Sequence, residues 1–169
     1  MHRSDTIEKA ANTLVAALLS AGKTVAAAES CTGGWLAKAI TDIAGSSGCF
    51  AYGIVSYSNE AKEALLDVDP DTLRDHGAVS EATVREMAAG VLDLSGADIA
   101  VAISGIAGPD GGTPDKPAGT VWFSWASRSP GGVSVDAALH RLHGDREAVR
   151  RQSVVLALDG VRERIEANG

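Results

Sequence analysis

The chain has 169 residues, of which 45% are hydrophobic and 22% charged, and this ordinary globular composition can bury one core without disulfides or metal. A formal net charge of −7 argues against a nucleic-acid partner, because neutralising phosphates requires clustered lysine and arginine. Two cysteines, Cys31 and Cys49, are too few for a secreted disulfide framework, and no cysteine or histidine spacing fits a zinc site, so no metal is expected.

The N-terminal half alternates helices with short apolar strands. Asp5 and Glu8 resemble a helix-capping pair, and apolar residues then recur at helical spacing as far as Gly22. A buried strand is expected over 24–28, because β-branched residues open an apolar run that is too short for a helix. The next expected elements are a helix over 34–42, a loop at 45–48, a strand over 50–57 and a short helix carrying Lys62.

The C-terminal half continues this alternation and ends in a hairpin. Asp69 and Ser80 are expected to cap two helices, with Pro70 at the first helical position of the former. The remaining expected elements are strands over 97–103, about 119–126 and about 133–140, and a last helix from about 145 to 166 capped by Asp145. This order predicts an α/β fold, a three-layer α/β/α sandwich with a mixed, mostly parallel sheet and one C-terminal antiparallel hairpin.

Two of the expected strands end in glycine- and serine-containing loops. The first ends at Glu29, Ser30 and Cys31 and is followed by a glycine pair, and the strand over 97–103 ends in the loop 104–112. Ligands of α/β sheets bind at the carboxyl ends of strands, and a helix beginning at the glycines would direct free N–H groups toward an anion. If the two strands are neighbours, their loops form one cleft. The alternative is that the glycines merely turn the chain and that Ser30 or Thr32 caps the helix.

Ser30, Lys62 and Tyr57 are the expected catalytic residues, as nucleophile, base, and relay or orienting group. None of the four histidines follows a strand end in a triad-like context, so the better base is a lysine whose pKa is lowered by burial or by a neighbouring cation. Cys31 is a competing nucleophile, but adjacent side chains on an extended segment point to opposite faces, so both cannot point into the cleft. The alternative for Lys62, which lies close to two glutamates, is an ordinary solvated helix lysine.

Two features are candidates for holding an anionic group of a substrate. Arg146 opens the last helix, and with Arg141, Arg150 and Arg151 it forms a basic cluster sufficient for one small anion. The loop 104–112 could instead cradle the anion with backbone N–H groups, although it matches neither the phosphate-loop nor the dinucleotide fingerprint. The alternatives are that Arg146 is an ordinary surface arginine and that the loop 104–112 is only a flexible connection.

Five segments carry a family resemblance: Ala28 to Gly34, Tyr57 to Lys62, Gly77 to Ser80, Ser104 to Gly112 and Gly144 to Arg146. From about Asp5 to Ile165 the chain resembles the C-terminal domain of the competence/damage-inducible CinA family, whose stand-alone members are nicotinamide-nucleotide amidohydrolases. The resemblance implies hydrolysis of the carboxamide of nicotinamide mononucleotide to nicotinate mononucleotide and ammonia, a step that recycles pyridine nucleotides. No metal or organic cofactor is implied.

The resemblance also implies a serine and a lysine as the catalytic pair, which Ser30 and Lys62 match, with Tyr57 in the segment beside them. Backbone N–H groups of the turn after Ser30 would stabilise the oxyanion, at about 3 kcal/mol per donor. The expected substrate-binding residues are Cys31, Thr32, Gly33, Gly34, Ser104, Gly105, Ala107, Gly108 and Arg146. Longer family members carry an N-terminal domain associated with pyrophosphatase activity on ADP-ribose, and we expect this chain to lack that activity.

The expected partners are the mononucleotide substrate and a second copy of the chain, with a dimer favoured. Trp122 or Trp125 on the hairpin would mark the dimer face, unless alternation places them in the core. The N-terminus carries no apolar signal core and no stretch reaches membrane-spanning length, so a cytoplasmic location without membrane partners is expected. The alternative function is a non-catalytic nucleotide-binding or interaction module linked to competence and DNA damage. Degenerate catalytic positions would have favoured this alternative, but the positions are intact in this chain.

Overall fold

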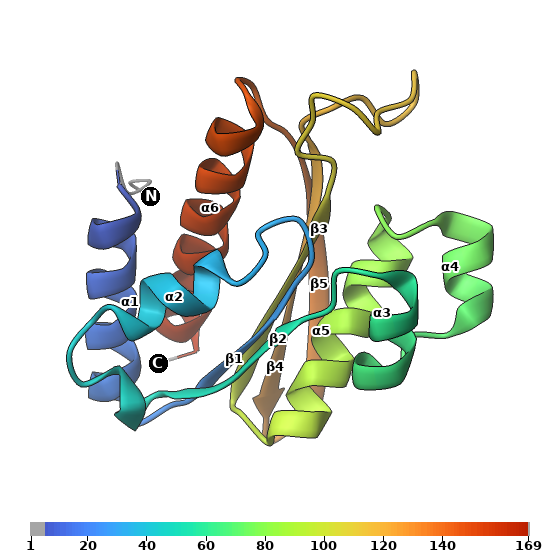
Figure 1. The fold of residues 1–169 in the computed structure, drawn as a ribbon. Helices are drawn as coiled ribbons and strands as arrows, with labels where there is room; N and C mark the ends of the chain where they lie inside the picture. Colours follow the sequence, from blue (N-terminus) through green and yellow to red (C-terminus); the bar gives the residue numbers. More distant parts are fainter. Residues whose placement is uncertain (1–5, 169) are drawn as a thin grey trace.

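A mixed five-stranded sheet forms the centre of the computed structural model, which describes residues 6–168 (Figure 1). The strand order is β2-β1-β3-β4-β5. The strands are β1 (Val25–Glu29), β2 (Phe50–Val55), β3 (Ile99–Gly105), β4 (Thr120–Ser129) and β5 (Gly132–Arg141). β1 pairs in parallel with both β2 and β3, whereas β4 is antiparallel to β3 and to β5. β4 alone therefore runs against the other strands, and the predicted mixed sheet with a C-terminal hairpin is confirmed.

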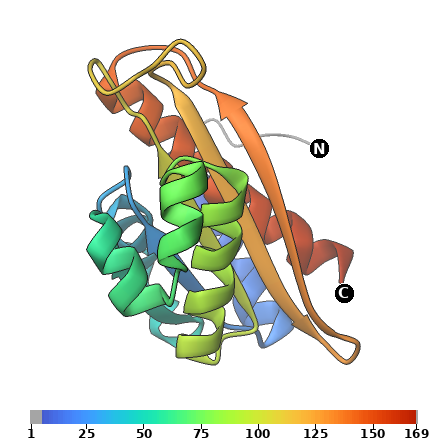
Figure 2. The same ribbon diagram turned by 90° about the vertical axis from the view of Figure 1, so that its right-hand side faces the viewer.

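Helices cover both faces of this sheet, as Figures 1 and 2 show. One layer contains α1 (Ile7–Ala21), α2 (Trp35–Thr41) and α6 (Arg146–Ala167). The other contains α3 (Asn59–Leu66), α4 (Pro70–His76) and α5 (Glu81–Ser95). The predicted three-layer α/β/α arrangement is thus confirmed. Within residues 6–168, no helix is both long and apolar enough to cross a bilayer.

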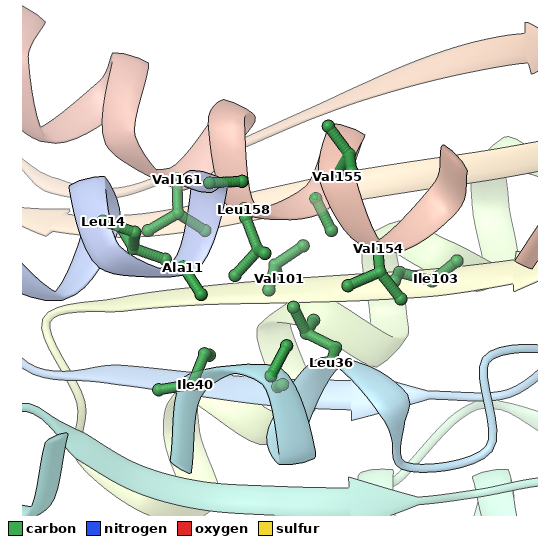
Figure 3. Packing of buried hydrophobic residues seen from close by; sticks show 14 of the residues in the cluster. Ala11, Leu14, Leu36, Ile40, Val101, Ile103, Val154, Val155, Leu158 and Val161 are labelled. Carbon is green, nitrogen blue, oxygen red and sulfur yellow. The ribbon is translucent and has the colours of Figure 1, made fainter. Parts of the chain in front are cut away.

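Side-chain size alternates along β3, the middle strand, and sets the spacing of the two helical layers. On β3, Ile99, Val101 and Ile103 point into the core shared with α1, α2 and α6, which Figure 3 shows. Ala100 and Ala102 point to the opposite face, where they pack with α5. The period of two along a strand thus gives a thick core on one face and lets α5 approach closely on the other.

Most helix starts follow the capping signals in the sequence. Asp69, Ser80 and Asp145 each accept a backbone N–H of the first turn that follows them. The predicted capping partner Asp5 lies outside the described residues, and the observed cap of α1 is Thr6, which accepts the N–H of Lys9. The predicted loop at 45–48 contains a short 3₁₀ helix, Ser46–Gly48.

Trp125 belongs to the core, so the expectation that it is exposed and marks a dimer face was wrong. It is 4% exposed and lies beneath α6, with the Arg164 guanidinium 4.0 Å from its ring centroid. Trp122, on the opposite face of β4, is half-buried and packs against the core beneath α5. Alternation along β4 therefore sends both indoles toward helices.

Gly160→Ala is expected to destabilise the protein, because a Cβ at position 160 would lie 2.7 Å from the Trp125 indole nitrogen. Alanine normally favours a helix, but overpacking of this contact should cost roughly 1–3 kcal/mol. Urea denaturation would measure the loss. Gly131→Ala, where the nearest atom is 3.8 Å away, is the matched control, and equal stability of the two variants would contradict the prediction.

Candidate active site

The carboxyl ends of β1 and β3 meet because the two strands are parallel neighbours. The Ser30 N–H donates to the Ile103 carbonyl at 3.0 Å, which links the two glycine-containing loops at their bases. Together they line one cavity of about 280 Å³. The expected site residues that line it are Ser30, Cys31, Tyr57, Lys62, Ser104, Gly105, Ala107, Gly108 and Arg146. The prediction that these loops form one cleft is therefore confirmed.

The side chains of Ser30 and Lys62 are in direct contact within this cavity. Lys62 Nζ lies 3.1 Å from Ser30 Oγ, 2.8 Å from the Ser56 carbonyl oxygen and 3.3 Å from that of Tyr57. A neutral amine has two N–H donors and one lone pair, so the two carbonyls can hold the donors while the lone pair faces the serine hydroxyl. The geometry therefore suits proton transfer from Ser30 to Lys62.

Lys62 is 1% exposed, although it lies on a helix between exposed glutamates, so the alternative of a solvated lysine was wrong. Burial lowers the pKa of the Lys62 ammonium below its ordinary value of 10.5, because desolvation penalises the charged form. Within residues 6–168 no carboxylate forms an ion pair with it. Its contacts are thus those of a base rather than of a salt-bridge partner.

The Cys31 side chain packs in the core shared with α1, α2 and α6, whereas Ser30 Oγ contacts Lys62 on α3, so the two adjacent side chains face opposite layers as expected. Cys31 still contributes to the lining of the cavity. The thiol is nevertheless a poor nucleophile: burial raises the pKa of Cys31 to about 11, which keeps it protonated near neutral pH.

Glu29 organises the site but was not singled out by the sequence analysis. It is fully buried, and its two carboxylate oxygens accept the N–H groups of Leu36 at 2.8 Å and Ala37 at 3.0 Å. It therefore occupies the N-terminus of α2, which was expected to be free for an anion, and neither Ser30 nor Thr32 caps the helix. One signal in the sequence could have indicated this role of Glu29. It is a carboxylate at the end of an apolar strand, followed by a helix whose cap position is a glycine without a side chain to accept the helix N–H groups.

The turn after Ser30 keeps some of its backbone N–H groups free. The Gly33 N–H donates to the Ser30 carbonyl and the Trp35 N–H to the Thr32 carbonyl, each at 3.0 Å. Among residues 6–168, the N–H groups of Cys31 and Thr32 donate to no other residue. The Thr32 side chain is completely buried, and its hydroxyl has no partner among the described residues.

The second loop is fixed by close backbone contacts. Ser104 Oγ donates to the Ala78 carbonyl at 2.8 Å and is 1% exposed. A Cβ at Gly105 would lie 2.7 Å from Val121 Cγ2 and 2.9 Å from the Thr120 carbonyl, so a glycine is required there. The loop thus lies directly against β4, and its Ala107 and Gly108 backbone lines the cavity.

Arg146 connects the two sides of the cavity mouth. Its guanidinium donates to the Gly108 carbonyl at 2.9 Å and to the Tyr57 hydroxyl at 3.3 Å. Tyr57 is 61% exposed, and its contact with Lys62 is made by its backbone carbonyl, whereas its phenol lies at the rim.

A second depression, of about 720 Å³, shares Arg146 with the cavity. Gly33, Gly34, Trp35, Lys38, Glu147 and Arg150 also line it. Of the other two clustered arginines, Arg141 is bound to Thr120 and the Asp115 carbonyl, and Arg151 is exposed. Residues 6–168 contain no group of histidine, cysteine and acidic side chains that could hold a metal ion.

The sequence profile of the CinA C-terminal domain matches residues 7–165. The chain belongs to the CinA C-terminal domain family. It is 56% identical to the nicotinamide-nucleotide amidohydrolase PncC of Escherichia coli over an alignment of 142 residues, which covers 84% of each of the two chains. It is also 54% identical over 150 residues to a CinA-like protein of Chlorobaculum tepidum, covering 88% of this chain and 36% of that longer protein.

Solved CinA-superfamily structures have the same fold. A crystal structure from Klebsiella pneumoniae superposes with a TM-score of 0.90 at 42% identity, covering 96% of this chain and 99% of the other. The competence/damage-inducible protein of Agrobacterium tumefaciens gives a TM-score of 0.89 at 39% identity, with 98% and 99% covered. The CinA C-terminal domain fold therefore accounts for nearly the whole chain.

Burial of Lys62 should make stability rise with pH. Between the lowered folded-state pKa and 10.5, the unfolded chain binds a proton that the folded chain has lost, so raising the pH favours the folded state. The unfolding free energy of the wild type minus that of Lys62→Met should therefore increase from pH 7 to pH 10.5 in urea titrations. Lys38→Met, which removes a 69% exposed lysine, controls for the lost charge. A difference that falls with pH would be inconsistent with the buried amine.

Glu29→Gln should weaken the junction between β1 and α2, because its amide group would set an N–H donor against a helix N–H. Leaving one buried donor unsatisfied costs about 1–3 kcal/mol, measurable by chemical denaturation. Glu60→Gln, at an exposed position of α3, is the control. A Glu29→Gln variant as stable as this control would show that the carboxylate does not hold α2.

Proposed function

We propose that this chain hydrolyses the carboxamide of nicotinamide mononucleotide to nicotinate mononucleotide and ammonia, with residues 1–169 acting as one amidohydrolase domain. The contact between Lys62 Nζ and Ser30 Oγ, at 3.1 Å in the shared cavity, carries the proposal. The 56% identity to a nicotinamide-nucleotide amidohydrolase supports the choice of substrate.

Ser30 is the proposed nucleophile and Lys62 the base that activates it. The serine Oγ attacks the carboxamide carbon while neutral Lys62 takes its proton, and the carbonyl oxygen becomes an oxyanion. Lys62 then gives the proton to the departing nitrogen, the C–N bond breaks, and ammonia leaves. A nicotinoyl ester on Ser30 remains.

Water completes the reaction at the same pair. Lys62 removes a proton from the water that attacks the ester carbonyl, and returns it to Ser30 Oγ when the C–O bond breaks. Nicotinate mononucleotide leaves, and the serine and the neutral lysine are regenerated. The cycle consumes one water molecule and uses no metal or organic cofactor.

The N–H groups of Cys31 and Thr32 are the proposed oxyanion donors, since they follow the nucleophile directly and donate to no other residue in the described part of the chain. One such donor typically contributes about 3 kcal/mol to transition-state stabilisation. Gly33 and Gly34 form the turn that presents them. Arg146 and the 104–112 loop lie together at the mouth, where they can share the substrate phosphate.

Ser30→Ala should abolish ammonia release, with kcat reduced about 10³-fold or more, while mononucleotide binding persists. Cys31→Ser is the matched control and should keep most of the activity, because the Cys31 thiol is protonated. A coupled ammonia assay and calorimetry measure the two quantities. An active Ser30→Ala variant, or an inactive Cys31→Ser variant that still folds, would point to the cysteine instead.

Catalysis by Lys62 requires the neutral amine, so kcat/KM should rise with pH until the lowered pKa of Lys62 is passed.

Turnover of the mononucleotide, nicotinamide riboside and free nicotinamide, measured side by side, tests the substrate class. Binding of the mononucleotide without ammonia release would favour the non-catalytic module. Light scattering tests the expected dimer.

A further inference from the structure

Arg150, on α6, binds the turn that carries the nucleophile. Its Nε donates to the Cys31 carbonyl and its Nη2 to the Thr32 carbonyl, both at 3.1 Å. The guanidinium carbon also lies 5.3 Å from the centroid of the Trp35 ring, at the start of α2. One half-buried side chain, more than a hundred residues away in sequence, therefore contacts Cys31, Thr32 and Trp35 together.

These two hydrogen bonds constrain which way the peptide groups of the turn face. The only cis peptide bond among residues 6–168 is Gly108–Pro109, so the Cys31–Thr32 peptide is trans. In a trans peptide the carbonyl and the next N–H point in opposite directions. Because Arg150 holds the Cys31 carbonyl, the Thr32 N–H points away from Arg150 and from the second depression that Arg150 lines.

The chemistry of the side chain fits this role. A guanidinium is always charged and presents its donors as a planar fork, which two adjacent carbonyls can accept together. No ion pair of Arg150 occurs within residues 6–168, so its charge is not neutralised by a carboxylate. That charge lies beside the peptide groups next to Ser30, where the negative oxyanion would form.

We propose that Arg150 is a positioning residue: it holds the Cys31 carbonyl so that the Thr32 N–H of the same peptide remains directed at the oxyanion, and it holds the Thr32 carbonyl so that the turn beside Ser30 keeps its shape. This inference rests on the proposed amidohydrolase function. It assigns Arg150 to the transition state of the reaction rather than to binding of the substrate phosphate.

Arg150→Met keeps much of the side-chain volume and removes every donor. It should lower kcat for nicotinamide mononucleotide about 100-fold, the usual effect of impairing one oxyanion donor, and leave KM within about threefold. Arg150→Lys, which can reach one carbonyl, should fall between this variant and the wild type. The matched control is Arg151→Met, the next residue of the same helix, which is exposed and should behave as wild type.

The phosphate-binding alternative gives a different kinetic pattern. If Arg150 held the phosphate, Arg150→Met would raise KM for the mononucleotide and leave turnover of nicotinamide riboside unchanged. The positioning role instead requires kcat to fall for both substrates by the same factor. Selective loss with the mononucleotide, or a wild-type kcat in Arg150→Met, would overturn the proposal.

Amide hydrogen exchange tests the role without relying on the reaction. Peptides covering 31–35 should exchange at least about tenfold faster in Arg150→Met than in Arg151→Met, because two hydrogen bonds of the turn are lost. Unchanged exchange would overturn the proposal. If the wild type released no ammonia, the proposed function would fail, and exchange would still decide whether Arg150 holds the turn. Should Arg150→Met not fold, Arg150→Lys undergoes the same measurements, with a smaller change in the same direction expected.

Discussion

The buried amine of Lys62 is the constraint on which the rest of the site depends. A lysine removed from water without a carboxylate partner is costly as a cation, so the fold favours its neutral form. The Ser56 and Tyr57 carbonyls accept its N–H groups and fix its orientation. Strand β2 ends at Val55, short of the predicted end at Tyr57, so neither carbonyl is used in the sheet. The proposed base thereby has a lowered pKa without any contribution from a histidine.

The alternation of side chains at the end of β1 directs the adjacent residues Glu29 and Ser30 to opposite faces of the sheet. Val25 and Ala27 face the layer of α1, α2 and α6, and Glu29 continues that face to cap α2. Ala26 and Ala28 face the opposite layer, and Ser30 continues toward Lys62 on α3. One short strand thus anchors a helix on one side and leads into the proposed nucleophile on the other.

Helix α6 completes the site from the far end of the chain. Arg146 contacts the second loop and the Tyr57 hydroxyl, and Arg150 contacts the turn after Ser30. The helix is seated on β4 by Gly160, which leaves room for the Trp125 indole. Core packing at one end of α6 therefore controls where two guanidinium groups lie at the other.

The sequence by itself determined the layer order, the helix caps at Asp69, Ser80 and Asp145, and the two glycine-containing strand ends, because these depend on local periodicity and turn chemistry. The same local reasoning brought out Ser30 and Lys62 as a candidate pair, and the family motifs supported that pairing. Only the tertiary structure decided that Lys62 is buried rather than solvated, since its neighbours in sequence are exposed and the atoms that contact its amine come from the segments after β1 and after β2. The roles of Glu29 and Arg150 were likewise set by packing: each binds backbone groups of another element, and neither a hydrophobic pattern nor a motif records such contacts.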